Sequence, residues 1–355
     1  MQIDGTSYRG GIVIGAPSII GDWAHNLIRD AATAMSPPLE VRLLDKFDDV
    51  GPEEEWPRTL YLTRYPSAPV ISIIENGLMP VVAFLDQACD AVAYIRRSVG
   101  CAFIEALRSA TSGAVANRAL LNAKTARVVY RNHSGTADAL IESIFEHLVM
   151  HLPAEAFDAI KQKYRGAAAG TATLEDSLRR NSSYKPAGKW SNELTASEAT
   201  IVDQVLKPIV LMAFKKECTP IRWTYQVLLS GDHPNEPAPM IAEVAGAARN
   251  IYYGPYLHMP PGTYRARLVA GYSKEAVGLP FSADVAGSTQ LAKARFRPTE
   301  PGILQGEFLV VHNLPQDPLE MRFRNDEGEI DGQVGVAWIE FEFLGNEDLP
   351  IHNVT

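Results

Sequence analysis

The sequence has few cysteines and no long apolar run, and these absences exclude several classes of protein. Only three cysteines, Cys89, Cys101 and Cys218, occur in 355 residues. They are too few and too scattered for a disulfide framework or a zinc site, so we expect small buried apolar residues. No uninterrupted apolar run approaches the ~20 residues that a membrane-spanning helix needs. Met1–Gly11 lacks the basic-then-apolar pattern of a secretion signal. We therefore expect a cytoplasmic protein without a membrane span.

Positive charge is also in short supply. The 33 Lys and Arg residues face 42 Asp and Glu residues, which gives a net charge of −9. Nucleic acids and anionic membranes require a basic footprint, so we expect neither as a partner, although this balance is compatible with a local basic pocket. The sequence shows no Ser/His/Asp set and no Gly-rich dinucleotide loop. His147 and His151 share a predicted helix, but nothing nearby completes a metal site, so we expect no metal.

What the chain does contain is a change of pattern that predicts two domains. Residues 1–217 alternate strand-like bursts with helical stretches, which is typical of an α/β layered domain with a parallel sheet and flanking helices. The predicted strands are Gly11–Gly15, Arg58–Thr63 and Ala126–Tyr130, with Val41–Leu44 as a further strand or an extended connection. Apolar residues at three- and four-residue steps predict helices over Asp22–Met35, Val81–Arg97, Ala102–Leu121, Ala137–His151, Glu155–Tyr164 and from Ala196 to about Phe214.

Residues 218–355 follow a different pattern, that of short strands separated by turns. This spacing predicts an all-β sandwich. The predicted strands are Ile221–Leu229, Ala238–Val244, Gly262–Ala270, Gly278–Val285, Leu291–Arg297, Gly302–Val311, Leu319–Arg324 and Val334–Phe343. The segment Tyr252–Tyr264 reads as an aromatic-rich loop, whose rings would either stack on sugars or fill one end of the sandwich.

The first strand leads into a candidate anion-binding turn. After Gly11–Gly15, the chain passes through Pro17, Ser18 and Gly21 to Asp22 and Trp23 at the start of a helix. A turn of this kind directs backbone N–H groups toward an anion. It lacks the Gly-Lys-Ser/Thr ending of an ordinary nucleotide-binding loop. Asp22 stands where an anion would otherwise sit, and the alternative is that it only caps the helix or completes its first turn.

Two further segments belong with this turn. Arg64 and Ser72 follow the strand at Leu60–Leu62, and Gly188, Lys189 and Trp190 precede the last α-domain helix. Each has a plainer interpretation. Arg64 would pair with a surface carboxylate or a helix end, and Trp190 would anchor a connection in the core.

Together, over residues 8–215, the three segments resemble the sulfotransferases that use 3′-phosphoadenosine 5′-phosphosulfate as donor, which implies a P-loop-type three-layer fold. In that family a Pro-Lys-Ser-Gly-Thr-Thr-Trp-like loop holds the 5′-phosphosulfate, and its counterpart here is Pro17–Trp23. An arginine and a serine eight residues later hold the 3′-phosphate, which implies this role for Arg64 and Ser72. In that family, a later Gly-x-x-Gly-x-Trp-like segment closes over the donor. The resemblance implies this closing role for Gly188, Lys189 and Trp190.

The donor loop departs from the family pattern at its charged positions. The family's lysine falls on Ser18 and its final threonines on Gly21 and Asp22. Sulfuryl transfer resembles phosphoryl transfer in that the protein positions the groups and neutralises charge. Losing a cation and gaining an acid would each cost on the order of one to a few kcal/mol of anion binding. Asp22 is a candidate catalytic residue of this loop. His133, after the third predicted strand, is a candidate general base, and the alternative for it is an exposed turn histidine.

These observations favour two functions. The first is a sulfotransferase-like transferase that moves a sulfuryl group from 3′-phosphoadenosine 5′-phosphosulfate to a hydroxyl of a small molecule or saccharide. The second is a catalytically inactive protein of the same fold that acts as a carbohydrate-binding or scaffold component. The aromatic segment favours a saccharide partner in both cases, since it weakly resembles the accessory sandwich modules of bacterial enzymes of polysaccharide assembly. A homo-oligomer is compatible with either function.

Overall fold

The computed structural model describes most of the chain and divides it into two compact units. The described residues are 10–44, 48, 50–118, 125–130, 135–165, 173–174, 178, 190, 193–213, 219–232, 236–243, 250–326 and 332–345. One unit comprises Met1–Cys101 and Ala116–Thr195, and the other comprises Ala102–Val115 and Ala196–Thr355. The division into domains at 217/218 stays a prediction, and each compact unit is described by itself below.

A five-stranded parallel sheet lies at the centre of the first unit, in the order β2-β3-β1-β4-β5. The strands are β1 (Gly11–Gly15), β2 (Glu40–Leu44), β3 (Thr59–Thr63), β4 (Val81–Leu85) and β5 (Ala126–Tyr130). In the middle strand, Val13 lies opposite Leu62 on one side and Val82 on the other. All residues of β1 and β3 are buried, as expected of parallel strands with both faces covered.

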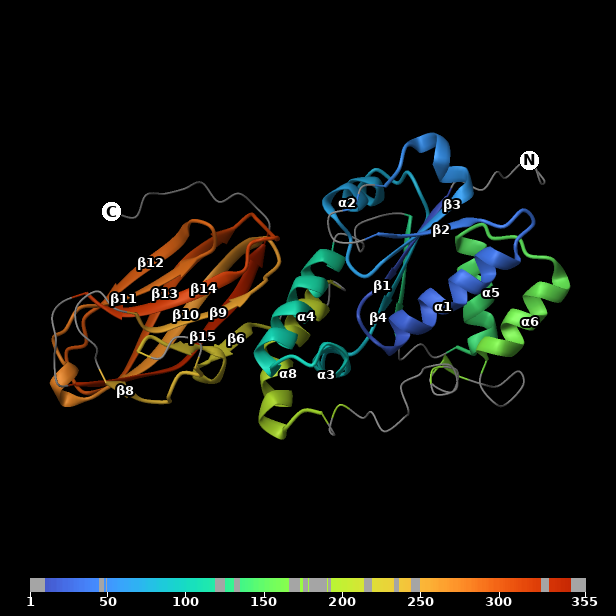
Figure 1. Cartoon of the computed structure of the whole chain (residues 1–355). Helices are drawn as coiled ribbons and strands as arrows, with labels where there is room; N and C mark the ends of the chain where they lie inside the picture. Colours follow the sequence, from blue (N-terminus) through green and yellow to red (C-terminus); the bar gives the residue numbers. More distant parts are fainter. Residues whose placement is uncertain are drawn as a thin grey trace. The chain divides into compact units, whose positions relative to one another are not determined.

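Helices cover both faces of this sheet, which gives the three layers that the sequence predicts (Figure 1). Val13, Leu62 and Phe84 point to the face covered by α1 (Ile19–Ala34), α5 (Ala137–His147) and α6 (Ala154–Tyr164). Ile12 and Ile14 point to the opposite face, which α2 (Ala68–Glu75) covers. The alternation follows from the period of two along a strand.

One predicted helix is wrong over its first part. Val81–Leu85, expected to begin a helix over Val81–Arg97, is strand β4, and the helix α3 covers Ala88–Val99. A run of apolar residues as short as Val81–Leu85 has no period that separates a buried strand from a buried helix. The helix α1 begins at Ile19, before the predicted start at Asp22, and Ser18 is its N-cap. Asp22 lies in the first turn, which is the other position that the sequence analysis allowed for it.

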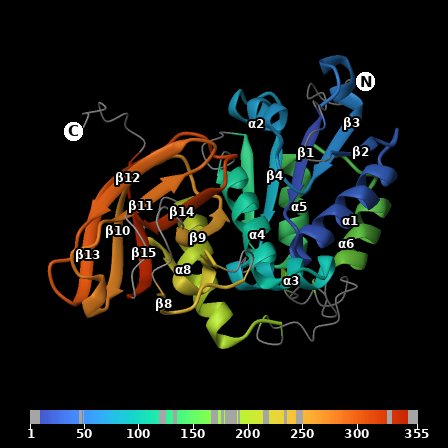
Figure 2. The same cartoon turned by 60° about the vertical axis from the view of Figure 1, so that its left-hand side comes forward.

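The second unit contains two antiparallel sheets, drawn from yellow through orange to red in Figure 2. One has the order β13-β10-β15-β6, with β8 also paired to β15, and the other has the order β12-β11-β14-β9-β7. The strands are β6 (Ile221–Thr224), β7 (Leu229–Ser230), β8 (Ala242–Glu243), β9 (Asn250–Leu257), β10 (Gly262–Tyr272), β11 (Phe281–Ala286), β12 (Gln290–Phe296), β13 (Gly302–His312), β14 (Leu319–Asn325) and β15 (Gln333–Gly345). Helices α4 (Phe103–Arg118) and α8 (Ala196–Ala213) fall largely in this unit, and α8 contacts β6.

Aromatic side chains fill the sandwich. The Phe281 and Phe323 rings stack with centroids 5.6 Å apart, and Tyr252 lies 6.5 Å from Phe323. The predicted aromatic loop at Tyr252–Tyr264 is instead most of β9 and the start of β10, and Tyr252 and Tyr264 are fully buried. The expectation of a loop here is therefore wrong, because alternate residues of these strands belong to the core.

We expect Phe323→Ala to lower the free energy of unfolding by about 3–5 kcal/mol, since it removes a fully buried ring from between two others. Urea denaturation followed by circular dichroism measures the loss. The matched control is Leu309→Ala on β13, whose side chain is 54% exposed and whose loss should stay within about 0.5 kcal/mol. Equal losses in the two variants would contradict this description of the core.

Candidate functional site

The strand order of the first unit creates a place for a ligand at the carboxyl edge of its sheet. The chain leaves β1 toward β2 on one side, and it leaves the neighbouring β4 toward β5 on the other. Ligands of open α/β sheets bind outside the carboxyl ends of strands at such a switch point. The predicted anion-binding turn after β1 lies at this edge, and so does Arg64, which directly follows β3.

Ser18 and Gly21 fix the shape of the turn. The buried Ser18 hydroxyl accepts a hydrogen bond from the Gly21 amide at 3.0 Å and donates one to the Ala16 carbonyl at 3.0 Å. A Cβ on Gly21 would stand 2.1 Å from the Ala16 oxygen, so no side chain fits there. The serine at the position of the family's lysine is therefore the N-cap of α1, and it takes one of the amides that would face an anion.

The central feature of the edge is an ion pair between two predicted site residues. An Arg64 Nη lies 2.5 Å from Asp22 Oδ1, and the other Nη donates to the Gly15 carbonyl at 3.2 Å. The Tyr94 hydroxyl of α3 donates to the second oxygen of the Asp22 carboxylate. The structure thus brings Asp22 and Arg64 together with Tyr94, which the sequence analysis missed because no spacing or motif marks it.

His25 lies behind this pair and is held neutral. Its side chain is buried, and its Nε2 has no hydrogen-bond partner among the described residues. Burial, followed by the positive charge of Arg64, lowers the pKa of His25 to about 4. Gly15 makes room for the imidazole, since a Cβ on Gly15 would stand 2.7 Å from His25 Nε2. The ring therefore adds no positive charge to this edge at neutral pH.

The other predicted residues of the turn and of α2 do not join this group. Trp23 is only 1% exposed and packs edge-on against Phe84 and Tyr164, with centroids 6.1 and 6.2 Å away. Pro17 is half-buried in the turn. Ser72 is exposed on α2, where its hydroxyl accepts from the Asn76 amide at 3.4 Å. Trp23 is thus part of the core.

The segment from Trp190 to Leu194, which precedes α8, is hydrogen-bonded to α3. The amides of Glu193 and Leu194 donate to the carbonyl of the half-buried Trp190 at 2.9 and 2.8 Å. Arg96 donates to the Glu193 carbonyl at 2.9 Å, and Arg97 pairs with the Glu193 carboxylate at 3.5 Å. This helix also carries Tyr94, so α3 connects the late segment with the Asp22–Arg64 pair. Gly188, Lys189 and His133 lie outside the described residues, and their roles stay predictions.

The described residues of the edge do not fit a 5′-phosphosulfate. The turn from Gly15 to Trp23 contains no lysine or arginine, and the nearby cation, Arg64, is already paired with Asp22. An incoming sulfate would meet the Asp22 carboxylate as a like charge. The arrangement is suited to fastening α1, the end of β3 and α3 to one another, and the pair presents no net positive charge to a ligand.

Membrane spans, metal sites and the cysteines can be assessed for the described residues alone. None of their helices is both long and apolar enough to cross a membrane. No group of three or more of their His, Cys, Asp and Glu side chains could hold a metal ion. Cys89 and Cys101 form no disulfide among the described residues and are half-buried, whereas we expected buried cysteines. Cys218 lies outside the described part.

The neutral state of His25 predicts a dependence of stability on pH. Its folded-state pKa of about 4 lies below the ordinary value of 6.5, so the unfolded chain binds a proton first as the pH falls. The stabilisation is complete above pH 6.5, and by pH 5 it should have fallen by about 2 kcal/mol. Urea denaturation above pH 6.5 and at pH 5 measures the loss of unfolding free energy for the wild type and for His25→Leu. The loss in His25→Leu should be smaller by about 2 kcal/mol. Identical losses would contradict a buried neutral His25.

No protein-family profile matches the chain, and no curated protein matches its sequence. Among solved structures, the crystal structure of mouse sulfotransferase SULT7A1 complexed with PAP is similar over 60% of this chain and 85% of that chain, at 11% identity and a TM-score of 0.38. The carbohydrate-binding module TmCBM61, in complex with β-1,4-galactotriose, is similar over 40% of this chain and 96% of its own, at 8% identity and a TM-score of 0.25. The carbohydrate-binding module CBM36, in complex with calcium and xylotriose, covers 35% of this chain and 99% of its own, at 14% identity and a TM-score of 0.23. At these identities none of them assigns a role to a residue of this chain.

Proposed function

We propose that this chain is a saccharide-binding component whose sulfotransferase-like α/β unit does not transfer sulfuryl groups. The observation that carries the proposal is the Asp22–Arg64 ion pair. Arg64 is the residue that the family resemblance assigns to binding the 3′-phosphate, and in this pair it is already neutralised. Asp22 also adds a carboxylate to the edge where the donor's sulfate would lie. The cytoplasmic location and the homo-oligomeric state expected from the sequence stay predictions.

The saccharide part of the proposal rests on the β unit. A cavity of about 430 Å³ lies at the β12 edge of one of its sheets, lined by side chains that include Lys293, Arg295 and Asp326. This volume falls within the range of small-ligand pockets. The tyrosines of β9 and β10 support it less than the sequence suggested. Tyr252 and Tyr264 are in the core, and the Arg108 guanidinium lies 5.3 Å from the centroid of the Tyr256 ring.

Sulfuryl transfer is the second candidate, and a specific observation favours it. The tight strand–turn–helix at Gly15–Gly21 keeps the backbone form of an anion-binding loop, and Arg64 lies at the same edge with 40% of its side chain exposed. In this case the donor would have to displace Asp22 from Arg64. The two candidates therefore differ in whether the Asp22 carboxylate yields to an anion.

Calorimetry with adenosine 3′,5′-bisphosphate separates the two candidates. If Asp22 keeps anions from Arg64, the wild type should give no binding heat at millimolar nucleotide. Asp22→Asn removes the competing charge and leaves the side chain's size unchanged, so we expect its affinity to exceed that of the wild type about tenfold or more.

The double variant Asp22→Asn/Arg64→Ala is the matched control and should lose the affinity that the single variant gains. Binding by the wild type that Arg64→Ala abolishes would overturn the proposal in favour of a working donor site. An unchanged Asp22→Asn variant would contradict the blocking role of Asp22. Circular dichroism of each variant confirms that the fold persists.

A further inference from the structure

Strand β12 presents a row of cations in a chain that is otherwise acidic. Lys293 and Arg295 lie in this strand and Arg297 directly follows it, so the three occupy alternate positions, and all three side chains are exposed. Alternate residues of a strand point to the same face and lie roughly 7 Å apart. The three cations therefore form a line along the edge of the β12-β11-β14-β9-β7 sheet.

The pairing of strands shows that this line lies on the outer face of the sheet. Lys293 is opposite Asp284 of β11, and Arg295 is opposite Ser282. The same two β11 residues are opposite Arg322 and Arg324 of β14. The residues between them on each strand, Ala283 and Phe323, point to the buried core.

Three acidic side chains described on this face, those of Asp284, Glu320 and Asp326, are already engaged by other cations. Arg324 lies 2.5 Å from the buried Asp284 carboxylate and 3.6 Å from that of Asp326. The Glu320 carboxylate accepts from Arg322 Nε at 2.6 Å. Within the described part of the chain, neither Lys293 nor Arg295 takes part in an ion pair. Among the described residues, no carboxylate therefore neutralises either charge, although the protein as a whole carries −9.

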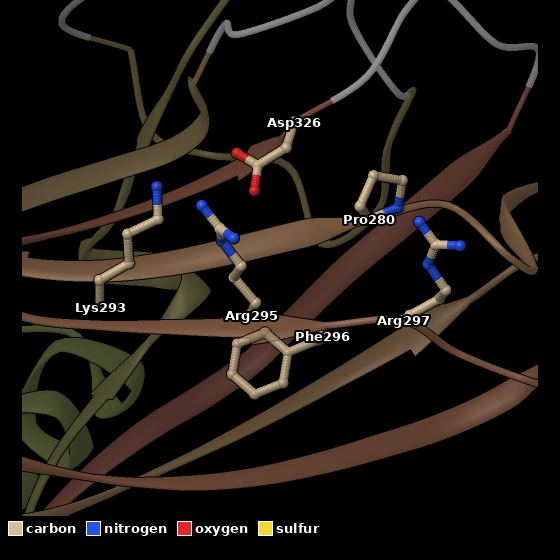
Figure 3. A pocket seen from close by; sticks show the side chains of 6 residues that line it. All are labelled: Pro280, Lys293, Arg295, Phe296, Arg297 and Asp326. Atoms are coloured by element: carbon tan, nitrogen blue, oxygen red, sulfur yellow. The ribbon is translucent and has the colours of Figure 1, made fainter. Parts of the chain in front are cut away.

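These cations line the cavity of about 430 Å³. Figure 3 shows Lys293 and Arg295 rising from β12 on the same side of the ribbon as Asp326, with Pro280 and Arg297 toward the other end. Phe296 also lines the cavity but points to the opposite side of the strand (Figure 3). Its ring lies over β13, where a Cβ on Gly306 would meet it at 2.0 Å.

We infer that this cavity binds an acidic saccharide, whose carboxylate or sulfate groups meet Lys293 and Arg295. The inference rests on the proposed saccharide-binding function and names its substrate class. Arginine and lysine both recognise such oxoanions through charge-assisted hydrogen bonds. Asp326, held by Arg324 and by the Ser282 hydroxyl at 2.9 Å, can accept hydrogen bonds from sugar hydroxyls.

The surroundings favour a saccharide over a nucleic acid. Single-stranded nucleic acid requires aromatic rings on which its bases stack, and the one ring that lines this cavity, Phe296, is turned toward Gly306. Away from this line of cations, the net negative charge of the chain would repel a long polyphosphate. A short acidic saccharide needs only the line itself.

Titration calorimetry with the full chain tests the inference with four probes: an oligogalacturonate, a sulfated cello-oligosaccharide, the same cello-oligosaccharide without sulfate, and an oligo(dT). We expect both acidic saccharides to bind at least tenfold more tightly than the neutral one. The preference should weaken as salt rises from 50 to 300 mM, because the cations are exposed. The two acidic probes distinguish a carboxylate ligand from a sulfate ligand.

Lys293→Ala and Arg295→Ala should each weaken binding of the acidic saccharides about tenfold and leave the neutral one unchanged. The matched control is Lys274→Ala, which removes the same charge from an exposed position away from the cavity lining and should have no effect. Equal losses in Lys293→Ala and Lys274→Ala would overturn the assignment of the site.

The remaining outcomes separate this inference from the proposed function. Equal binding of neutral and acidic saccharides would overturn the acidic preference and leave the saccharide-binding function standing. Binding of oligo(dT) as tight as that of the acidic saccharides, with the same loss in Lys293→Ala, would overturn the saccharide assignment. No binding of any saccharide would overturn both.

Discussion

The ion pair between Asp22 and Arg64 sets the charge at the carboxyl edge of the α/β unit. Its distance of 2.5 Å and the added hydrogen bond from Tyr94 join the first turn of α1, the residue after β3, and α3. Both side chains are partly exposed, so the pair contributes little to stability by itself. Its effect is on charge, because it leaves the described residues of this edge without a net cation and adds a carboxylate to them. His25 reinforces this effect, since its lowered pKa keeps a second possible cation neutral.

The fold of this unit could be predicted well from the sequence because its strands are strongly apolar. Gly11–Gly15 and Thr59–Thr63 are buried on both faces, and only a parallel sheet between helix layers produces such runs repeatedly. Val81–Leu85 has the same character, but it leads into a helix with little punctuation, and its short run could not reveal where one element ends. Ser18 shows the same limit at a single residue, because its role as N-cap depends on the turn's geometry and not on its neighbours in sequence.

The candidate site could be predicted only in part, because contacts between distant residues have no local signal. The sequence singled out Asp22 and Arg64 for separate reasons, and weighed a surface carboxylate as the partner of Arg64, but it could not show that the two would pair with each other. Tyr94 carries no motif at all. The sequence analysis did not single out the cations of β12, because whether acids neutralise them depends on which residues β11 and β14 place opposite. In the structure, Asp284 and Asp326 both pair with Arg324.

The charged row on β12 also has a consequence for folding. This strand ends its sheet, and an unpaired edge is a template for pairing with another chain. Between the cations lie Ala294 and Phe296, which are opposite the buried Ala283 and Phe281 of β11. A slip of one residue would exchange the two sets and drive Lys293 and Arg295 into the apolar core, at a large cost in desolvation. The side chains offered to a ligand therefore also select the correct alignment of the strand and discourage aggregation through its open side.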